Sequence, residues 1–360
     1  GADNLSDGNS CSIHQTWSYN GNWPYDWSDL CFQPQTKEEL KIAVDLWIDN
    51  NTSAISTYGD INTWDVSLIT DMSDLFRDSD FNSDISNWDV SNVTTMDAMF
   101  KNTNFNQDLN SWDVSSVTNM HRLFMESPFN RPIDNWDVSN VTDMSQMFRY
   151  AASFNQYLGS WDLTNVTNMY MLFHGASSFN SDISSWDVSN VTSMNRMFAD
   201  ASNFNQDISI WDVSNVTSMT YLFRETAFNY DLSSWNVQNV TGMKGMFKGA
   251  ESFNQPLNNW DVSSVVNMNE MFKGAETFNQ PLNNWDVSNV QNMGGMFWDA
   301  LTFNQDISTW DVSNVDLIDD IFLNANALSD ENKCSMHKSF SINDNWPYDW
   351  SDLCFQPQTK

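Results

Sequence analysis

Four cysteines are the residues of this 360-residue chain whose type and spacing point most directly to chemistry. Cys11 and Cys31 are 20 residues apart, and Cys334 and Cys354 repeat that spacing. A pair near each end with none between predicts two disulfide bonds, Cys11–Cys31 and Cys334–Cys354, each worth about 3 kcal/mol of stability. A zinc site that includes His14 is the alternative, but one histidine and two cysteines leave a ligand missing.

Aspartates that follow tryptophan are the second group of residues that could do chemistry. Stacked carboxylates about 5 Å apart repel one another unless each accepts backbone hydrogen bonds or shares cations. We expect backbone capping, because Asn236 replaces aspartate once in the series and an amide accepts equally well. Calcium bridging is the alternative, with Asp137, Asp162, Asp187 and Asp212 as candidate ligands. The full series is Asp65, Asp89, Asp113, Asp137, Asp162, Asp187, Asp212, Asp261, Asp286 and Asp311.

Asparagines supply a third set of candidates. Asn4, Asn50 and Asn51 lie in glycosylation sequons, and Asn140 is one of six asparagines that begin Asn-Val-Thr. Glycans on successive repeats about 5 Å apart would collide, so we expect sparse occupancy there and favour Asn50 or Asn51. A different asparagine follows phenylalanine in ten repeats, from Asn82 to Asn304, and predicts a side-chain ladder that caps turn amides.

Charge and composition exclude several classes of protein. Acidic residues number 47 and basic residues 15, so the formal charge of −32 argues against nucleic acid and anionic membranes as partners. No apolar run reaches the roughly 18 residues of a membrane span. The four histidines (14, 121, 174 and 337) form no recognisable catalytic constellation, so we expect neither an enzyme nor a bound cofactor, calcium excepted.

A repeat of 24 or 25 residues must position these side chains. Within one copy, Trp136, Val138, Val141, Met144 and Phe148 are among the apolar positions. So few apolar residues cannot close a core of their own, which predicts a solenoid of eleven coils with tryptophan and methionine in a shared core. We expect each coil to contain a short parallel strand at Trp136–Val138 and a short helix or 3₁₀ segment with Ser145 as N-cap. The repeating tryptophans are Trp64, Trp88, Trp112, Trp136, Trp161, Trp186, Trp211, Trp235, Trp260, Trp285 and Trp310.

The segments around the coils complete the predicted organisation. Thr36 and Glu39 form a capping box that opens a helix, whose apolar face (Leu40, Ala43, Val44, Trp47 and Ile48) should cover the first coil. We therefore expect four parts. These are a disulfide-bonded junction (1–35), a capping helix and lead-in (36–60), the eleven-coil solenoid (61–325), and the start of a second junction (326–360, a copy of 3–37).

The repeat resembles a known family. Trp186–Phe198 followed by Phe204–Ser209 is similar, almost residue for residue, to the BspA-like surface-protein repeat, a Mycoplasma-type repeat of about 25 residues. The resemblance implies a leucine-rich-repeat-like solenoid. The resemblance covers residues 61 to about 325. It implies a secreted or cell-surface protein that acts in adhesion, and it supplies no catalytic residues.

A second, longer period indicates how the protein is used. Residues 22–37 are identical to 345–360, an offset of 323 that also relates Cys11 to Cys334. We interpret the chain as one 323-residue module of a longer extracellular filament or surface fibre, a glycoprotein whose partners are copies of itself joined end to end. The alternative is a calcium-dependent adhesin that binds glycans or surface proteins, with Tyr150, Tyr157, Tyr170, Tyr221, Tyr230 and Trp298 as candidate contacts.

Overall fold

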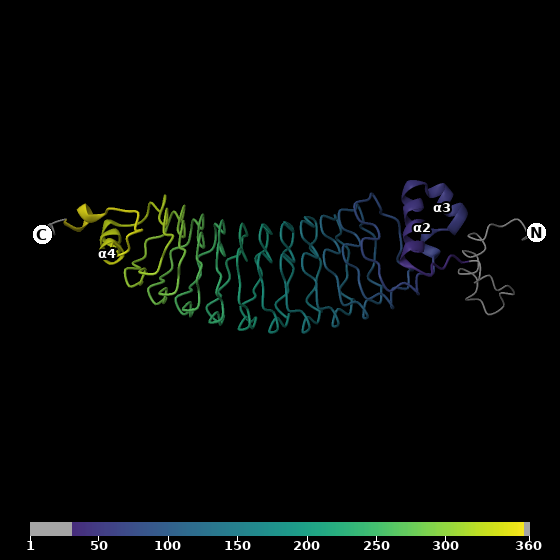
Figure 1. Ribbon diagram of the computed structural model, residues 1–360, viewed down its shortest axis with the longest axis horizontal. Helices are drawn as coiled ribbons and strands as arrows, with labels where there is room; N and C mark the ends of the chain where they lie inside the picture. The colour runs from purple at the N-terminus through teal and green to yellow at the C-terminus, as the bar shows by residue number, and fades with distance from the viewer. Residues whose placement is uncertain (1–30, 356–360) are drawn as a thin grey trace, which may run out of the picture. The chain divides into compact units, whose positions relative to one another are not determined.

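The computed structural model describes residues 31–355, and the chain forms two compact units, residues 1–165 and 166–360. The boundary falls inside the fifth repeat, so the span predicted as one solenoid is divided between the units. The first unit contains α2 (Lys37–Asp49), α3 (Asn51–Tyr58) and the 3₁₀ helix η2 (Ile61–Thr63), and the second contains α4 (Asp330–Phe340) and the 3₁₀ helix η3 (Ser351–Phe355). Within each unit, successive repeats form coils that lie side by side (Figure 1).

Within each unit, the backbone of one coil is bonded to the next mainly through a seven-residue segment, Met72–Asp78 in the first coil, which we call the turn segment. The amides of Met72, Asp74, Phe76 and Asp78 donate to carbonyls of the second coil at 2.8–3.0 Å, and the amides between them donate within their own coil. The acceptors are the carbonyls of Thr95, Asp97, Met99 and Lys101. Alternate amides therefore bond between coils, as in a parallel sheet.

This arrangement corrects the predicted helical segment. Two residues of each turn segment, four positions apart, have left-handed backbones, such as Asp74 and Asp78 with φ of 56° and 57°. A helix needs negative φ throughout and uses its amides within the segment. The helix or 3₁₀ segment with Ser145 as N-cap is therefore wrong, and consecutive turns take its place.

The predicted strand is also misplaced. Within the described coils, parallel pairing is reduced to isolated bridges such as Thr95–Asn119 and Asn119–Asp143, which lie directly before the turn segment and not at Trp136–Val138. The extended residues at Trp136 and Val138 instead bury their side chains, at 3% and 1% exposure.

The core consists of stacked columns of identical side chains. In the first unit, the rings of Phe76, Phe100, Phe124 and Phe148 follow one another at 5.4–5.8 Å with nearly parallel planes. A second phenylalanine stacks on the first within each coil, as Phe105 does on Phe100 at 4.1 Å. Each such aromatic pair adds about 0.5–1.5 kcal/mol to the gain from burial. The methionines of the turn segments are all buried, which confirms their role as core residues.

Polar columns run beside the core, and most of the repeat tryptophans take part in one. The indole nitrogen of Trp88 donates to the carbonyl of Ile61 at 2.8 Å, and that of Trp136 donates to Leu109 at 2.9 Å. The same bond recurs in the second unit, for example from Trp235 to Ile208. The one polar atom of each of these rings is therefore satisfied by the preceding coil.

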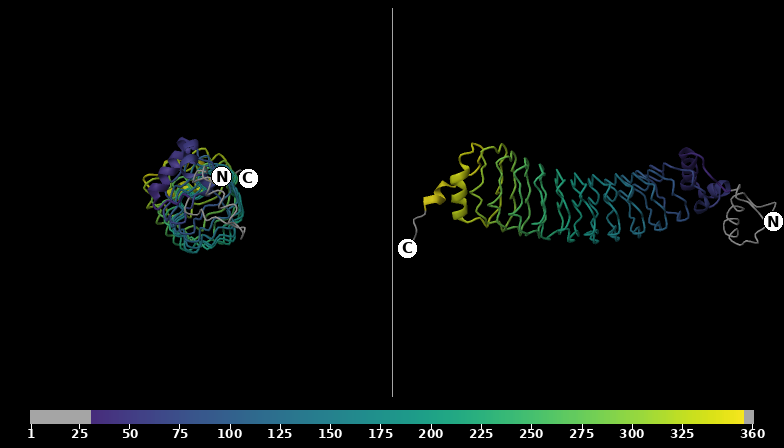
Figure 2. Two further views of the ribbon diagram at one scale, coloured as in Figure 1. Left: turned by 90° about the vertical axis from the view of Figure 1, so that its right-hand side faces the viewer. Right: turned by 90° about the horizontal axis from the view of Figure 1, so that it is seen from below.

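The helix α2 lies where the capping box predicts it, and it covers the first coil (Figure 2). The Thr36 side chain accepts a hydrogen bond from the amide of Glu39, and the buried face includes Leu40, Ala43, Val44 and Trp47. Trp47 packs edge-on against Trp64 at 6.0 Å and donates its indole N–H to Ser83 at 2.9 Å. The edge of the first coil is therefore closed by packing.

Candidate module junction

The last coil ends where α4 begins, and the N-terminus of α4 completes the column of asparagines. Within each unit, the side-chain oxygen of one such asparagine accepts the backbone N–H of the equivalent asparagine one coil later, as Asn279 does from Asn304 at 2.9 Å. After the last coil, Ser329 takes the place of the next asparagine and donates its N–H to Asn304 at 2.8 Å. Asn332 donates to the same oxygen at 2.9 Å, as glutamines do in the coils.

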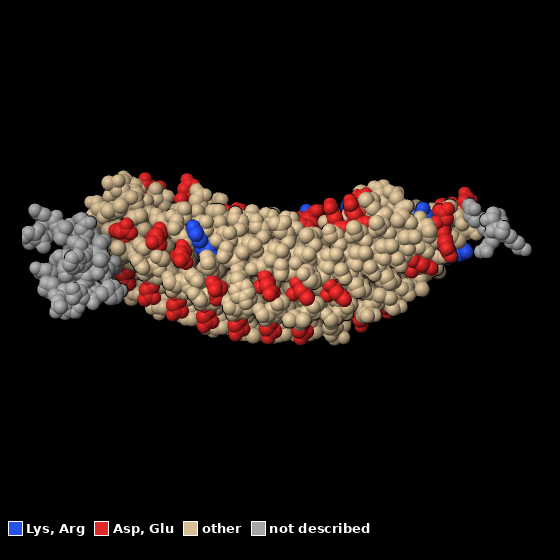
Figure 3. Space-filling view, turned by 180° about the vertical axis from the view of Figure 1, so that it is seen from behind, with Lys and Arg blue, Asp and Glu red and all other residues tan. Residues whose placement is uncertain are grey.

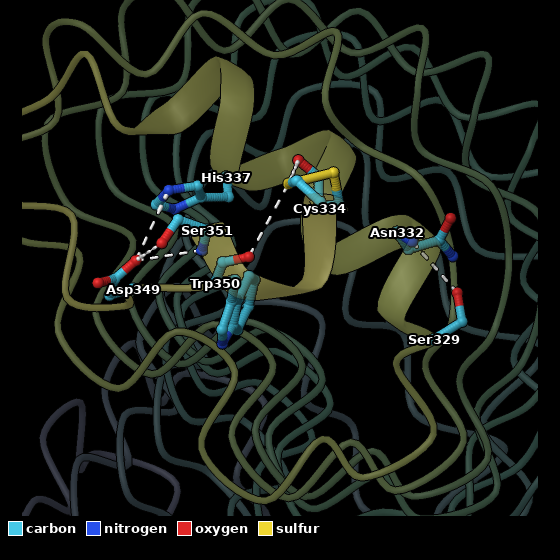
Figure 4. The surroundings of a disulfide bond; sticks show 8 residues. Ser329, Asn332, Cys334, His337, Asp349, Trp350 and Ser351 are labelled. Atoms are coloured by element: carbon cyan, nitrogen blue, oxygen red, sulfur yellow. Dashed lines mark hydrogen bonds and ion pairs between the residues drawn. A yellow bond between two sulfur atoms is a disulfide. The ribbon is translucent and has the colours of Figure 1, made fainter. Parts of the chain in front are cut away.

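Ser329 also starts α4, so one residue both ends the column and caps a helix. Its hydroxyl accepts the N–H of Asn332, and Asp330 and Glu331 occupy the first turn (Figure 4). A serine N-cap followed by acidic residues is a standard sequence signal for a helix start. The sequence analysis missed α4, although Ser329, Asp330 and Glu331 carried this signal.

The chain beyond α4 covers the remaining edge of the last coil. Asn343, 8% exposed, donates its side-chain amide to the carbonyls of Val312 and Val315 at 2.7 and 2.9 Å. The Tyr348 hydroxyl accepts the amide N–H of Phe322 at 3.1 Å, and burial raises the pKa of this hydroxyl. The rings of Trp346, Tyr348 and Trp350 surround Phe322 at 6.0–6.4 Å. Phe322, the last ring of the core column, is thereby covered.

A disulfide bond holds this cover to α4. Cys334 in α4 is bonded to Cys354 in η3, which confirms the predicted pair (Figure 4). Ser351 donates both its hydroxyl and its N–H to Asp349, and these bonds lower the pKa of the Asp349 carboxyl. Cys31 is also disulfide-bonded, and its predicted partner Cys11 lies outside the described residues, as do His14 and Asn4. Because the sulfurs of Cys334 and Cys354 are joined, they are not thiolate ligands for zinc.

The residue after the equivalent cysteine near the N-terminus contacts the first coil. Phe32 lies against Tyr58 at 4.4 Å and Trp64 at 5.2 Å, and its carbonyl accepts the N–H of Asp65. The offset of 323 makes Phe32 the counterpart of Phe355, the residue directly after Cys354. The C-terminal end therefore shows how the first part of the junction sequence contacts the last coil, and the N-terminal end shows how its continuation contacts the first coil.

Every aspartate that follows a repeat tryptophan accepts the backbone N–H two residues later. Asp137, Asp162, Asp187 and Asp212 accept from Ser139, Thr164, Ser189 and Ser214 at 3.0 Å. Asn236 makes the same bond at 3.2 Å, so backbone capping is confirmed. Across residues 31–355, no three His, Cys, Asp or Glu side chains converge into a group that could hold a metal ion. Calcium bridging stays a prediction.

The predicted glycosylation asparagines have structural roles. Asn140 donates its side-chain nitrogen to the carbonyl of Ser115 in the preceding coil at 2.8 Å. Four other sequon asparagines make the equivalent bond, namely Asn92, Asn165, Asn215 and Asn239. The Asn50 side-chain oxygen caps α3 by accepting from Ser53, which leaves its nitrogen uncommitted. Asn50 and Asn51 are both exposed.

Columns of identical side chains that link coil to coil define a tandem-repeat protein. The chain belongs to the family described as "Mycoplasma protein of unknown function, DUF285", which matches residues 48–158, 125–233 and 223–335. That description names no activity and does not single out BspA. No curated protein matches the chain. No helix in the described part is long and apolar enough to cross a membrane.

Proposed function

We propose that this chain is an extracellular structural and adhesive protein of the BspA-like type, in which solenoid modules of 323 residues follow one another in a filament or surface fibre. One observation carries the proposal. Residues 326–355, which cover the last coil, repeat residues 3–32, and the next residue of the earlier copy, Gln33, already contacts the first coil by donating to Asp65 at 2.7 Å.

This arrangement leaves no linker between modules. Cys354 belongs to the segment that covers the last coil of one module. The residue after it, Phe355, corresponds to Phe32, which packs on the first coil of a module. Modules joined by flexible linkers behave as independent bodies. Modules that share a junction without spacer residues should instead keep a fixed relative orientation.

The disulfide and the charge support an extracellular location. Disulfides persist in oxidising compartments such as the cell exterior. A charge of −32 keeps long arrays hydrated and discourages side-by-side aggregation.

A two-module protein tests the proposal. Adding residues 38–360 after Lys360 continues the pattern, because 324–360 already repeats 1–37. Electron microscopy should show particles with one narrow distribution of the angle between modules, with and without EDTA. The control carries a Gly-Ser spacer of about four residues inserted directly after the first module's Cys354, and it should show a broad distribution.

Two outcomes would contradict the proposal. Equally broad angles with and without the spacer would show that the modules are independent. A fixed angle without EDTA that becomes broad when EDTA is added would favour the calcium-dependent adhesin. Electrophoresis of native material without reductant gives the complementary result, since a tandem array should migrate as very large chains.

A further inference from the structure

Basic residues of the repeats are concentrated in the turn segments. Of the ten lysines and arginines between residues 61 and 325, nine lie in turn segments and only Arg131 lies elsewhere. Acidic side chains dominate the face shown in Figure 3. The nine residues are Arg77, Lys101, Arg122, Arg149, Arg196, Arg224, Lys244, Lys248 and Lys273.

The turn segments also hold most of the candidate aromatic contacts. Tyr150, Tyr170, Tyr221 and Trp298 lie in turn segments, at different positions of the repeat. They therefore lie in the same part of their coils although they occupy different positions of the repeat. Tyrosine, tryptophan and arginine are the residues most enriched where proteins bind partners.

Three cations from successive coils surround one of these rings, Tyr221. The guanidinium carbon of Arg196 lies 5.0 Å from the ring centroid, that of Arg224 lies 5.9 Å away, and the Lys244 ammonium lies 5.8 Å away. The ring is seated on Gly245, where an added Cβ would lie 2.2 Å from the ring. The backbone of the next coil thus fixes the ring about which the cations gather.

Protein carboxylates neutralise this cluster only in part. Arg224 approaches Asp200 at 3.6 Å, but Asp200 also lies 3.4 Å from His174, and the Arg224 Nε is buried without a hydrogen-bond partner. Among the described residues, Arg196 and Lys244 form no ion pair, whereas Lys248 in the same coil as Lys244 is paired with Glu270 at 2.7 Å. Clustered like charges are unfavourable unless an anion offsets them.

We propose that Arg196, Arg224 and Lys244 bind the sulfate or carboxylate group of a small acidic ligand, such as a sulfated sugar or a uronic acid. Arginine and lysine provide the charge-assisted donors that such oxyanions require. A small ligand is favoured over a polyanion or a second copy of the chain, because repulsion from the net charge of −32 grows with the charge of the partner. Since the Debye length is about 8 Å at physiological salt, the local cations dominate at the site.

Isothermal titration of the full chain with glucose 6-sulfate, glucuronate and uncharged glucose tests this site. We expect saturable binding of at least one of the acidic sugars at one site per chain, and none of glucose. The variants Arg196→Gln and Lys244→Gln should each weaken binding about tenfold, since each removes one charge-assisted hydrogen bond. Glutamine keeps a long side chain at both positions, and thermal unfolding of each variant verifies that the fold is retained.

Arg122→Gln is the matched control. Arg122 occupies the same repeat position as Arg196 and has the same left-handed backbone, with φ of 56° at both, but it is not part of the Tyr221 cluster. The proposal is overturned if no acidic sugar binds saturably, if glucose binds equally well, or if Arg122→Gln weakens binding as much as Arg196→Gln. None of these outcomes bears on the fixed angle between modules.

Discussion

The first and last coils are closed by helices that work in different ways. The helix α2 presents a continuous apolar face of Leu40, Ala43, Val44 and Trp47 to the first coil. The helix α4 buries fewer apolar side chains and closes the last coil through its N-terminus, where Ser329 and Asn332 satisfy the open acceptor of Asn304. The comparison shows that the edges of a repeat array are chemically different, and that each cap supplies what its edge lacks.

Removing the aromatic contact of the N-terminal cap should have the largest effect. Trp47→Ala loses the packing on Trp64 and the hydrogen bond to Ser83, so we expect about 3–5 kcal/mol of destabilisation. Ile42→Ala on the same helix is the control, because Ile42 is 62% exposed. Hydrogen exchange of the first coil measures the effect, and equal exchange in both variants would contradict packing as the basis of this cap.

Removing the disulfide should have the next largest effect, now at the C-terminal cap. The double variant Cys334→Ser, Cys354→Ser opens a loop of about 20 residues, and we expect a loss of about 3 kcal/mol. The measurement is urea unfolding with and without reductant. Reductant should destabilise the wild type and leave the stability of the C-terminal coils in the double variant unchanged. Equal sensitivity in both proteins would show that this disulfide does not hold the cover.

Breaking the polar contacts of the C-terminal cap should cost less. Asn332→Ala removes two hydrogen bonds to Asn304, and we expect about 1 kcal/mol. Gln280→Ala removes the equivalent bonds to Asn254 inside the array and is the matched comparison. If α4 completes the column as another coil would, exchange near Asn304 should rise in the first variant as much as exchange near Asn254 rises in the second. No change for Asn332→Ala alone would mean that the helix closes the coil by packing.

The smallest effect concerns the coils between the caps, and it depends on pH. Hydrogen bonds from the serine hydroxyl and then its backbone N–H lower the pKa of Asp113, Asp137, Asp187, Asp212 and Asp286. A lowered pKa in the folded state gives stability that is present above the unfolded value of about 3.9 and is lost as pH falls through the folded pKa. Stability should therefore decline below about pH 4.

The variant with all five aspartates changed to asparagine tests this origin. Its thermal midpoint should fall less than that of the wild type over the same acid range, because an amide does not titrate and Asn236 already makes the equivalent bond. Parallel curves for the two proteins would assign the acid sensitivity to other carboxylates.

The sequence predicts the composition of the coils well but not their backbone. Trp136, Val141, Met144 and Phe148 are recognisable as core residues from period and type alone, and all are buried. The helix after Ser145 was a wrong prediction, because apolar spacings of three suit both helices and tight turns. What decides between them is bonding to the neighbouring coil, which no local pattern reveals.

The candidate sites show the same division between local and long-range information. The disulfide Cys334–Cys354 and the capping by Asp137 follow from short-range spacing. The cation cluster joins side chains from three coils, and its members Arg196, Arg224 and Lys244 occupy three different repeat positions. Such a cluster becomes recognisable only when the coils are stacked.

The direction of the hydrogen bonds between coils has an electrostatic consequence. In the turn segments, backbone N–H groups such as that of Met72 point toward the following coil. In the side-chain columns, donors such as the indole of Trp88 and the amide nitrogen of Asn92 point toward the preceding coil. An α-helix aligns all its peptide dipoles and accumulates partial charge at its ends. Here the two sets of hydrogen bonds point in opposite directions, so their dipoles partly offset one another between neighbouring coils.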